Sequence, residues 1–174
     1  MPMVSVRTAT TRDKIPVARV HVHSWQVGYR GLIPDHVLNL MKPEDRAARY
    51  TFGEVDATSP RTIVATEGHD IVGFATFGAS RDVDRPNEGE ILALYVDPDA
   101  WGRGVGHTLM VSARTYLREM SFTMASLWVL EGNQRAIRFY ERDGWSSAGL
   151  GREEVVWGAA VKEICYRRSL IGGT

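Results

Sequence analysis

The stretch VDPDAWGRGVGHTLM, from Val96 to Met110, joins a β-like segment to an apolar segment through three glycines at alternate positions. Before it, EILALYVDP predicts a strand that ends at Pro98. After it, apolar residues recur at helical spacing and predict an amphipathic helix of about four turns; they are Leu109, Met110, Ala113, Leu117 and Met120. A glycine-rich turn that enters a helix presents unpaired backbone N–H groups at the positive end of the helix dipole, an arrangement typical of phosphate binding.

The glycine spacing separates the kinds of loop that share this geometry. A P-loop needs Lys and then Ser or Thr after its last glycine, but His107 and Thr108 follow Gly106. A dinucleotide fingerprint needs its third glycine three residues after the second, whereas Gly102, Gly104 and Gly106 are evenly spaced. The P-loop is therefore excluded and the dinucleotide interpretation is weak. A glycine-rich turn without a ligand stays open on these residues alone.

Length and composition bound the class of protein. The chain of 174 residues suits one domain, 1–174, with a core of its own. The chain has 21 Lys and Arg and 21 Asp and Glu, so its formal net charge is zero. Without an overall positive charge we expect neither a nucleic-acid nor a membrane partner. Cys165 is the only cysteine, which excludes an intrachain disulfide; we interpret it as a small buried residue. The start MPMVSVRTAT lacks the pattern of a signal peptide, so we expect a cytoplasmic protein.

The rest of the chain alternates between strand-like and helix-like segments. We expect strands at VSVRTA, at 61–66 and 71–77 joined by the turn EGHD, at ASLWVL, and in a closing pair that includes 161–168. One or two short helices are expected in PDHVLNLMKPEDRAARYTF. The segment NQRAIRFYERDG predicts a helix with Asn133 as N-cap and Gly144 just past its end.

A further helix follows the first strand, and two starts are consistent with the sequence. Thr10 with Asp13 three residues later predicts a capping box. Pro16 suits the first position of a helix, because it has no N–H to leave unpaired. The start of this helix stays open.

Together, EILALYVDPDAWGRGVGHTLM and ASLWVLEGNQRAIRFYERDGW resemble the two signature motifs of the GNAT superfamily, whose members transfer an acetyl group from acetyl-CoA to an amine. The family's second motif is matched by Asn133, Ala136, Phe139, Tyr140, Gly144 and Trp145. In the first motif Gly104 and Gly106 match, but Trp101 stands where Arg or Gln is usual. The resemblance therefore implies a backbone cradle for pyrophosphate without a side-chain contact from the motif's first position.

The resemblance implies an α/β (α+β) fold. We expect a mixed, mostly antiparallel central sheet of six to seven strands, flanked by about four helices and splayed at the acetyl-CoA site. It also implies that acetyl-CoA is the co-substrate and that pantetheine lies along one strand as an additional strand. The implied cofactor-binding residues are Leu94, Tyr95, Val96, Gly102, Arg103, Gly104, Val105, Gly106 and Asn133.

Aminolysis of a thioester requires two proton-handling groups, because a substrate ammonium with a pKa near ~10 must lose a proton and a thiolate, whose thiol has a pKa of about 8.5, must gain one or be stabilised. By resemblance the general acid is Tyr140. The resemblance also implies Glu90 as the general base, because several family members carry a glutamate at the start of the strand that corresponds to EILALYV. Glu88 would point the same way if the strand began earlier.

The acceptor site is expected near HSWQVGYRGLIP, where Trp25 and Tyr29 lie four residues apart on one helix face. Core packing is the competing explanation for this pair. The histidines have no partner at metal-ligand spacing, so no metal is expected. The acceptor is a small-molecule or peptide amine that the sequence does not identify, a homodimer stays open, and so does an acyl group other than acetyl. A non-catalytic acyl-CoA-binding domain is the alternative function; it would need neither Tyr140 nor a base.

Overall fold

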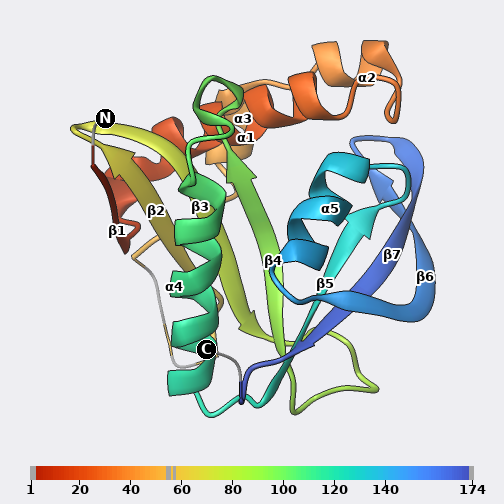
Figure 1. The fold of residues 1–174 in the computed structure, drawn as a ribbon. Coiled ribbons are helices and arrows are strands. Elements are labelled where there is room, and N and C mark those ends of the chain that lie inside the picture. Colours follow the sequence, from red (N-terminus) through yellow and green to blue (C-terminus); the bar gives the residue numbers. More distant parts are fainter. Residues whose placement is uncertain (1–2, 54–55, 57, 173–174) are drawn as a thin grey trace.

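The computed structural model describes residues 3–53, 56 and 58–172, and these contain a seven-stranded sheet in the order β1-β2-β3-β4-β5-β7-β6 (Figure 1). The strands are β1 (Val4–Thr8), β2 (Arg61–Glu67), β3 (Asp70–Ala79), β4 (Gly89–Val96), β5 (Met124–Leu130), β6 (Ser146–Val156) and β7 (Ala159–Ser169). Only β4 and β5 pair in parallel; the other neighbours pair antiparallel. The expected mixed, mostly antiparallel sheet is confirmed.

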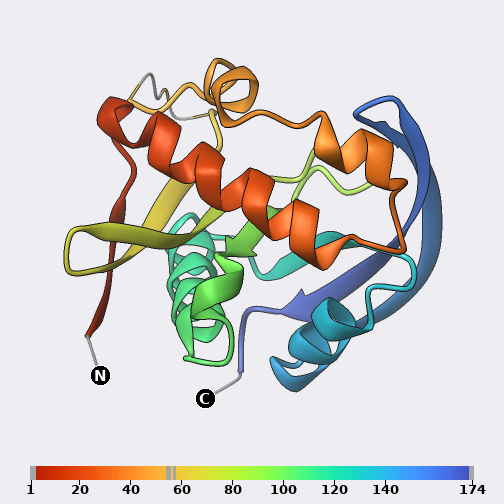
Figure 2. The ribbon, with the colours of Figure 1, turned by 90° about the horizontal axis from the view of Figure 1, so that it is seen from above.

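Helices cover both faces of the sheet (Figure 2). They are α1 (Lys14–Gly28), α2 (Asp35–Asn39), α3 (Pro43–Ala47), α4 (Val105–Glu119) and α5 (Gln134–Arg142), with short 3-10 turns η1 (Thr11–Asp13) and η2 (Pro98–Ala100). The described residues thus hold five α-helices where about four were expected. Val17 and Val20 of α1 pack on one face of the sheet, and Leu109 and Leu117 of α4 pack on the other. No described helix has the length and apolar character needed to cross a membrane.

The capping box of Thr10 and Asp13 starts the 3-10 turn η1, and α1 follows it directly from Lys14, with Asp13 as its N-cap residue. The carboxylate of Asp13 accepts a hydrogen bond from the backbone N–H of Thr10 at 2.7 Å, which is the reciprocal contact of a capping box. Pro16 then lies in the first turn of α1, where its missing N–H costs no hydrogen bond. The predicted capping box is confirmed, but it opens η1 rather than α1, and Pro16 is the third residue of α1 and not its first.

The C-terminal third also follows the expected order. Asn133 caps α5 through its side-chain oxygen, which accepts from the N–H of Ala136 at 3.3 Å. Gly144 follows α5 with a φ of 88°, the left-handed conformation that ends many helices. Strands β6 and β7 form the closing pair, and Cys165 of β7 is fully buried as expected.

A β-bulge in β4 changes which side chains share a face. The register between β3 and β4 shifts so that Leu92 is an extra residue. Ile91 packs in the core under α4, whereas Ala93 and Tyr95 pack on the α1 side. Without the bulge all three odd-numbered residues would face one way. Because of it, Glu90 and Tyr95 lie on the same face.

The bulge coincides with the point where β4 and β5 part. The two strands pair only over three residues, from Gly89 to Ile91 on β4 and from Ala125 to Leu127 on β5. Beyond these pairs β4 and β5 diverge, and α5 lies in front of the gap (Figure 1). The carboxyl-terminal half of β4 therefore has no partner strand on that side. This is the expected splay of the sheet.

Candidate functional site

A cavity of about 480 Å³ lies where β4 and β5 diverge. Its wall comes from β4, the glycine loop, the first turn of α4, β5 and α5. Most of the residues that the sequence assigned to the cofactor line this cavity: Leu94, Tyr95, Val96, Gly102, Gly104, Val105, Gly106 and Asn133, together with Tyr140. Arg103 is the exception, because its guanidinium contacts Glu67 Oε2 and the carbonyl of Asp99, both at 3.1 Å.

The glycines of the loop are required for two different reasons. Gly102 and Gly104 have φ angles of 76° and 83°, and a Cβ on either would meet no atom within 4 Å. Their backbone conformation, rather than lack of space, therefore excludes other residues. Gly106 is helical, and its Cβ would lie 3.3 Å from Cε2 of Phe139 in α5. Gly106 thus allows α5 to pack against the start of α4.

The N-terminus of α4 opens into the cavity with unpaired donors. Thr108 donates the first hydrogen bond of this helix, to the carbonyl of Gly104 at 3.0 Å. The N–H groups of Val105, Gly106 and His107 precede it and have no partner within the helix. These donors and the helix dipole favour an anion at this end of the cavity.

The free edge of β4 supplies backbone groups along the cavity. Asp97 donates its N–H to Val72 of β3 at 2.8 Å. Since the backbone groups of successive strand residues point to alternate sides, those of Leu94 and Val96 point away from β3 and toward the gap. The carbonyl of Val96 accepts from the indole N–H of Trp101 at 2.9 Å. Leu94 thus has both backbone groups free for a ligand and Val96 has its N–H, whereas the backbone of Tyr95 faces β3.

Tyr140 presents a protonated hydroxyl to this cavity. Its ring packs against Phe139 and Trp145, with centroids 5.4 and 6.5 Å away. Burial raises the pKa of Tyr140 well above its ordinary value, and nearby Tyr95 adds to the shift. The pKa of Tyr29 is also raised, chiefly by burial. Both phenols therefore remain hydrogen-bond donors at neutral and moderately alkaline pH.

A second cavity of about 70 Å³ adjoins the first. The two share Tyr29, Ile91, Leu92, Tyr95, Trp128 and Leu130 in their walls. The rings of Trp25 and Tyr29 lie 4.9 Å apart, and Trp25 lines only the smaller cavity. The indole N–H of Trp25 is buried without a protein acceptor among the described residues. The predicted acceptor pair is thus brought together beside the larger cavity, and it also packs in the core with Val22 and Leu38.

Glu90 lines the smaller cavity but is tied to an arginine. Its side chain is 3% exposed, and both oxygens contact Arg81 at 2.9 Å: Oε1 accepts from the guanidinium and Oε2 from the backbone N–H. The sequence did not indicate Arg81 or the pair of Arg152 with Glu163, 2.7 Å apart, on the same cavity. Glu88 precedes β4 and pairs with Arg167 instead. The strand does not begin early enough to align it with Glu90.

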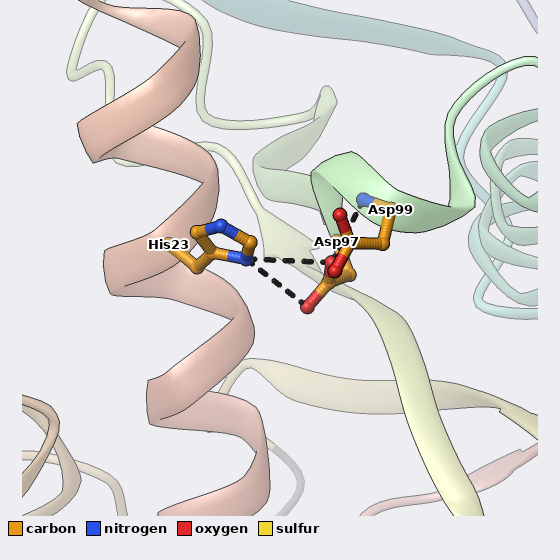
Figure 3. Close-up of side chains that lie close together, drawn as sticks. All are labelled: His23, Asp97 and Asp99. Carbon is orange, nitrogen blue, oxygen red and sulfur yellow. Dashed lines mark hydrogen bonds and ion pairs between the residues drawn. The ribbon is translucent and has the colours of Figure 1, made fainter.

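Three side chains that the sequence did not group lie near the glycine loop (Figure 3). His23 Nδ1 lies 3.4 Å from each carboxylate oxygen of Asp97. Asp97 also accepts from the N–H of Asp99 at 2.9 Å and so caps the η2 turn. The possible ligand atoms of His23, Asp97 and Asp99 lie within 4.8 Å of one another. Capping of η2 and the tie between α1 and this turn account for the arrangement.

Comparison with known proteins agrees with this geometry. The family model described as "Acetyltransferase (GNAT) family" matches residues 25–145. The uncharacterized N-acetyltransferase YuaI of Bacillus subtilis is 28% identical over 177 residues, which cover 95% of this chain and 100% of that protein.

Two solved structures share the fold. The PaiA N-acetyltransferase of Thermoplasma acidophilum, in complex with coenzyme A, has a TM-score of 0.72 at 18% identity, covering 96% of this chain and 99% of that one. YncA of Salmonella typhimurium, whose structure holds acetyl-CoA as its cofactor, has a TM-score of 0.69 at 19% identity, covering 96% of this chain and 94% of that one.

Proposed function

This chain belongs to the GNAT family of acetyltransferases, which are acetyl-CoA-dependent acyltransferases, and from this premise we propose that residues 1–174 act as one domain that transfers the acetyl group of acetyl-CoA to a primary amine. The acceptor is a small molecule or the amine of a peptide or protein. One observation carries the proposal: a single cavity joins the unpaired amides at the start of α4 to the hydroxyl of Tyr140 and adjoins the smaller cavity of Trp25 and Glu90.

The residues of the larger cavity fit acetyl-CoA. The amides of Gly104, Val105, Gly106 and His107 would receive the pyrophosphate, supported by the dipole of α4. The open backbone groups of Leu94 and Val96 would pair with the pantetheine arm, beside Asn133 at the start of α5. Gly102 would allow the turn that orients these backbone amides toward the pyrophosphate.

Acetyl-CoA supplies an acetyl group activated as a thioester, and Tyr140 handles the sulfur side of the transfer. The amine nitrogen, after giving up one proton, forms a bond to the acetyl carbon, and the bond from that carbon to sulfur breaks with its electron pair on sulfur. The nitrogen then loses a second proton to water and the thiolate takes one proton from water, which leaves an amide and a free thiol. The pKa of Tyr140 lies above about 10, whereas that of a thiol is about 8.5, so complete transfer of the phenol proton to the thiolate costs at least ~2 kcal/mol. Tyr140 therefore acts mainly by donating a hydrogen bond to the departing sulfur.

The smaller cavity suits the attacking amine. Aromatic rings attract a cation through their faces, and here Trp25 and Tyr29 line the space, whereas the ring of Trp128 already carries the guanidinium of Arg152 at 4.3 Å. Glu90 lies in the same wall and would accept the proton of the ammonium, directly or through water. Because Arg81 already contacts both of its oxygens, Glu90 must use a remaining lone pair. Glu163 is the second carboxylate within reach of the same space.

A screen of amines tests this function. The protein is incubated with acetyl-CoA and a panel of amino acids, polyamines, aminoglycosides and peptides, and free thiol is measured together with the mass of the acetylated product. We expect thiol release that depends on one class of amine and falls in Glu90→Gln, with Glu163→Gln as the comparison that tells which carboxylate takes the proton. Tight acetyl-CoA binding without amine-dependent thiol release across the panel would favour a binding domain instead.

A further inference from the structure

Trp101 has a structural role that its place in the glycine motif does not suggest. Its indole N–H donates to the carbonyl of Val96 at 2.9 Å, which fixes the ring against the end of β4. The guanidinium carbon of Arg135, the second residue of α5, lies 3.5 Å from the centroid of that ring. Trp101 is therefore a platform on which an arginine from another element is stacked.

Arg135 is a cation without a carboxylate partner in the described part of the chain. It lines the larger cavity, and burial lowers its pKa. Besides burial, the groups that act on its pKa are Tyr29 and Tyr140, and because their own pKa values are raised, their phenols offer no counter-charge at neutral pH. A partly desolvated guanidinium gains most from an anion placed against it. The cavity that Arg135 lines is the one in which the α4 amides favour an anion.

The other contacts of Arg135 leave its donors available. A Cβ on Gly28, the last residue of α1, would lie 3.3 Å from Nη2 of Arg135, so the glycine leaves room for the guanidinium between α1 and Trp101. Stacking uses the face of the guanidinium, whereas its N–H groups lie at the edge. An arginine held by its face on a ring is thus oriented before a ligand arrives.

We propose that Arg135, stacked on Trp101, binds the diphosphate of acetyl-CoA from the α5 side, opposite the amides of the glycine loop. It supplies the cationic side-chain contact that Trp101 cannot make at the motif's first position. The inference rests on the proposed function, since it takes acetyl-CoA to be the ligand of the larger cavity. Arg138 and Arg142 line the same cavity but are not stacked on a ring there, so their side chains are not oriented in this way.

Binding of CoA at several salt concentrations tests the proposal. Calorimetric titration of Arg135→Ala at low ionic strength should give a dissociation constant raised about 10- to 100-fold. The difference from the parent should narrow as salt is added, because salt screens a charge contact to phosphate. Arg135→Lys keeps the charge without the planar fork and should fall between the two. Arg118→Ala, which removes one charge at the far end of α4, should bind CoA as the parent does.

The possible results separate the explanations. A loss in Arg135→Ala of the same factor at every salt concentration would show that Arg135 only packs α5 against Trp101, and an unchanged affinity would show no contact at all; both overturn the proposal. Thermal unfolding of each variant identifies one that fails to fold, in which case Arg135→Lys decides by the same salt criterion. A parent protein that binds no CoA would instead refute the proposed function.

Discussion

The aromatic ring of Phe139 packs against Gly106 so closely that a Cβ on this glycine would lie 3.3 Å from Cε2 of the ring. These two residues come from the two signature motifs, and their contact sets the approach of α5 to the start of α4. The same approach forms the cavity between the free edge of β4, the α4 amides and Tyr140. Gly106 is thus a packing requirement of the site, whereas Gly104 is a conformational one.

Substitution of Gly106 should therefore disturb the cavity through α5. We expect Gly106→Val to raise the dissociation constant of acetyl-CoA at least tenfold, because its added carbons displace Phe139.

Gly104→Ala should also weaken binding, but through strain at a φ of 83°, which costs an L-residue about 1–2 kcal/mol. Gly149→Ala is the matched control, since Gly149 has a φ of 70° with open space and lies in β6. Gly149→Ala should lose a similar free energy of unfolding in chemical denaturation but keep its affinity for acetyl-CoA. Equal losses of acetyl-CoA affinity in Gly104→Ala and Gly149→Ala would disprove a local role for Gly104.

Tyr140→Phe should lower the rate of acetyl transfer by about 100-fold, at the lower end of the usual range for a proton-handling group. The phenyl ring keeps the contacts to Phe139 and Trp145, so acetyl-CoA should bind as before. Single-turnover kinetics with a responsive amine measure the chemical step without interference from product release. Unchanged single-turnover rates in a folded variant would make Tyr140 a packing residue.

Trp25→Ala should raise the KM for the amine and leave the KM for acetyl-CoA near that of the parent, because Trp25 lines only the smaller cavity. The ring also packs 5.2 Å from His21 and 4.9 Å from Tyr29, so some stability is lost as well. Trp25→Phe retains most of this packing and removes the unpartnered indole N–H. A loss of thermal stability in both variants with neither KM changed would support core packing as the sole role.

Acid should destabilise the fold through His21. The side chain is 4% exposed, its Nδ1 accepts from Arg46 Nε at 3.1 Å, and burial lowers its pKa well below 6.5. Above about pH 6.5 His21 is neutral in the folded and in the unfolded protein, so it does not make the free energy of unfolding depend on pH. Below about pH 6.5 the unfolded chain binds a proton that the folded chain does not. Stability should then fall by up to ~1.4 kcal/mol for each pH unit. Urea unfolding at pH 7.5 and 5.0 should show this loss in the parent and in His69→Asn but a smaller one in His21→Phe; equal losses in all three would exclude His21.

Much of the fold could be predicted because the local signals agree with one another. The capping box of Thr10 and Asp13, the turn between β2 and β3, and the N-cap Asn133 each fix a boundary within a few residues. The strand order, with β7 between β5 and β6, depends on pairing between distant segments and was not predicted. Pro16 gave a competing start for α1 because its ring is tolerated anywhere in a first turn.

The site was predictable where its chemistry lies in the backbone and less so where it lies in side chains. The glycines signal a helix N-terminus directly, and they line the cavity. No spacing pattern in the sequence relates Glu90 to Arg81, which form an ion pair. The same holds for Arg135, which stacks on Trp101. The sequence also showed no sign of the bulge at Leu92. The bulge reverses which side chains face each side of the sheet, so the face of residues beyond it could not be predicted from simple alternation.

Hydrogen–deuterium exchange with and without CoA tests most directly whether the gap between β4 and β5 is the acetyl-CoA site. We predict that CoA slows exchange at the amides of Leu94 and Val96 and at those of Val105 and Gly106, while exchange in the β6–β7 hairpin stays unchanged. Protection that is absent from these amides at saturating CoA, or confined to another part of the chain, would show that acetyl-CoA does not bind between β4 and β5.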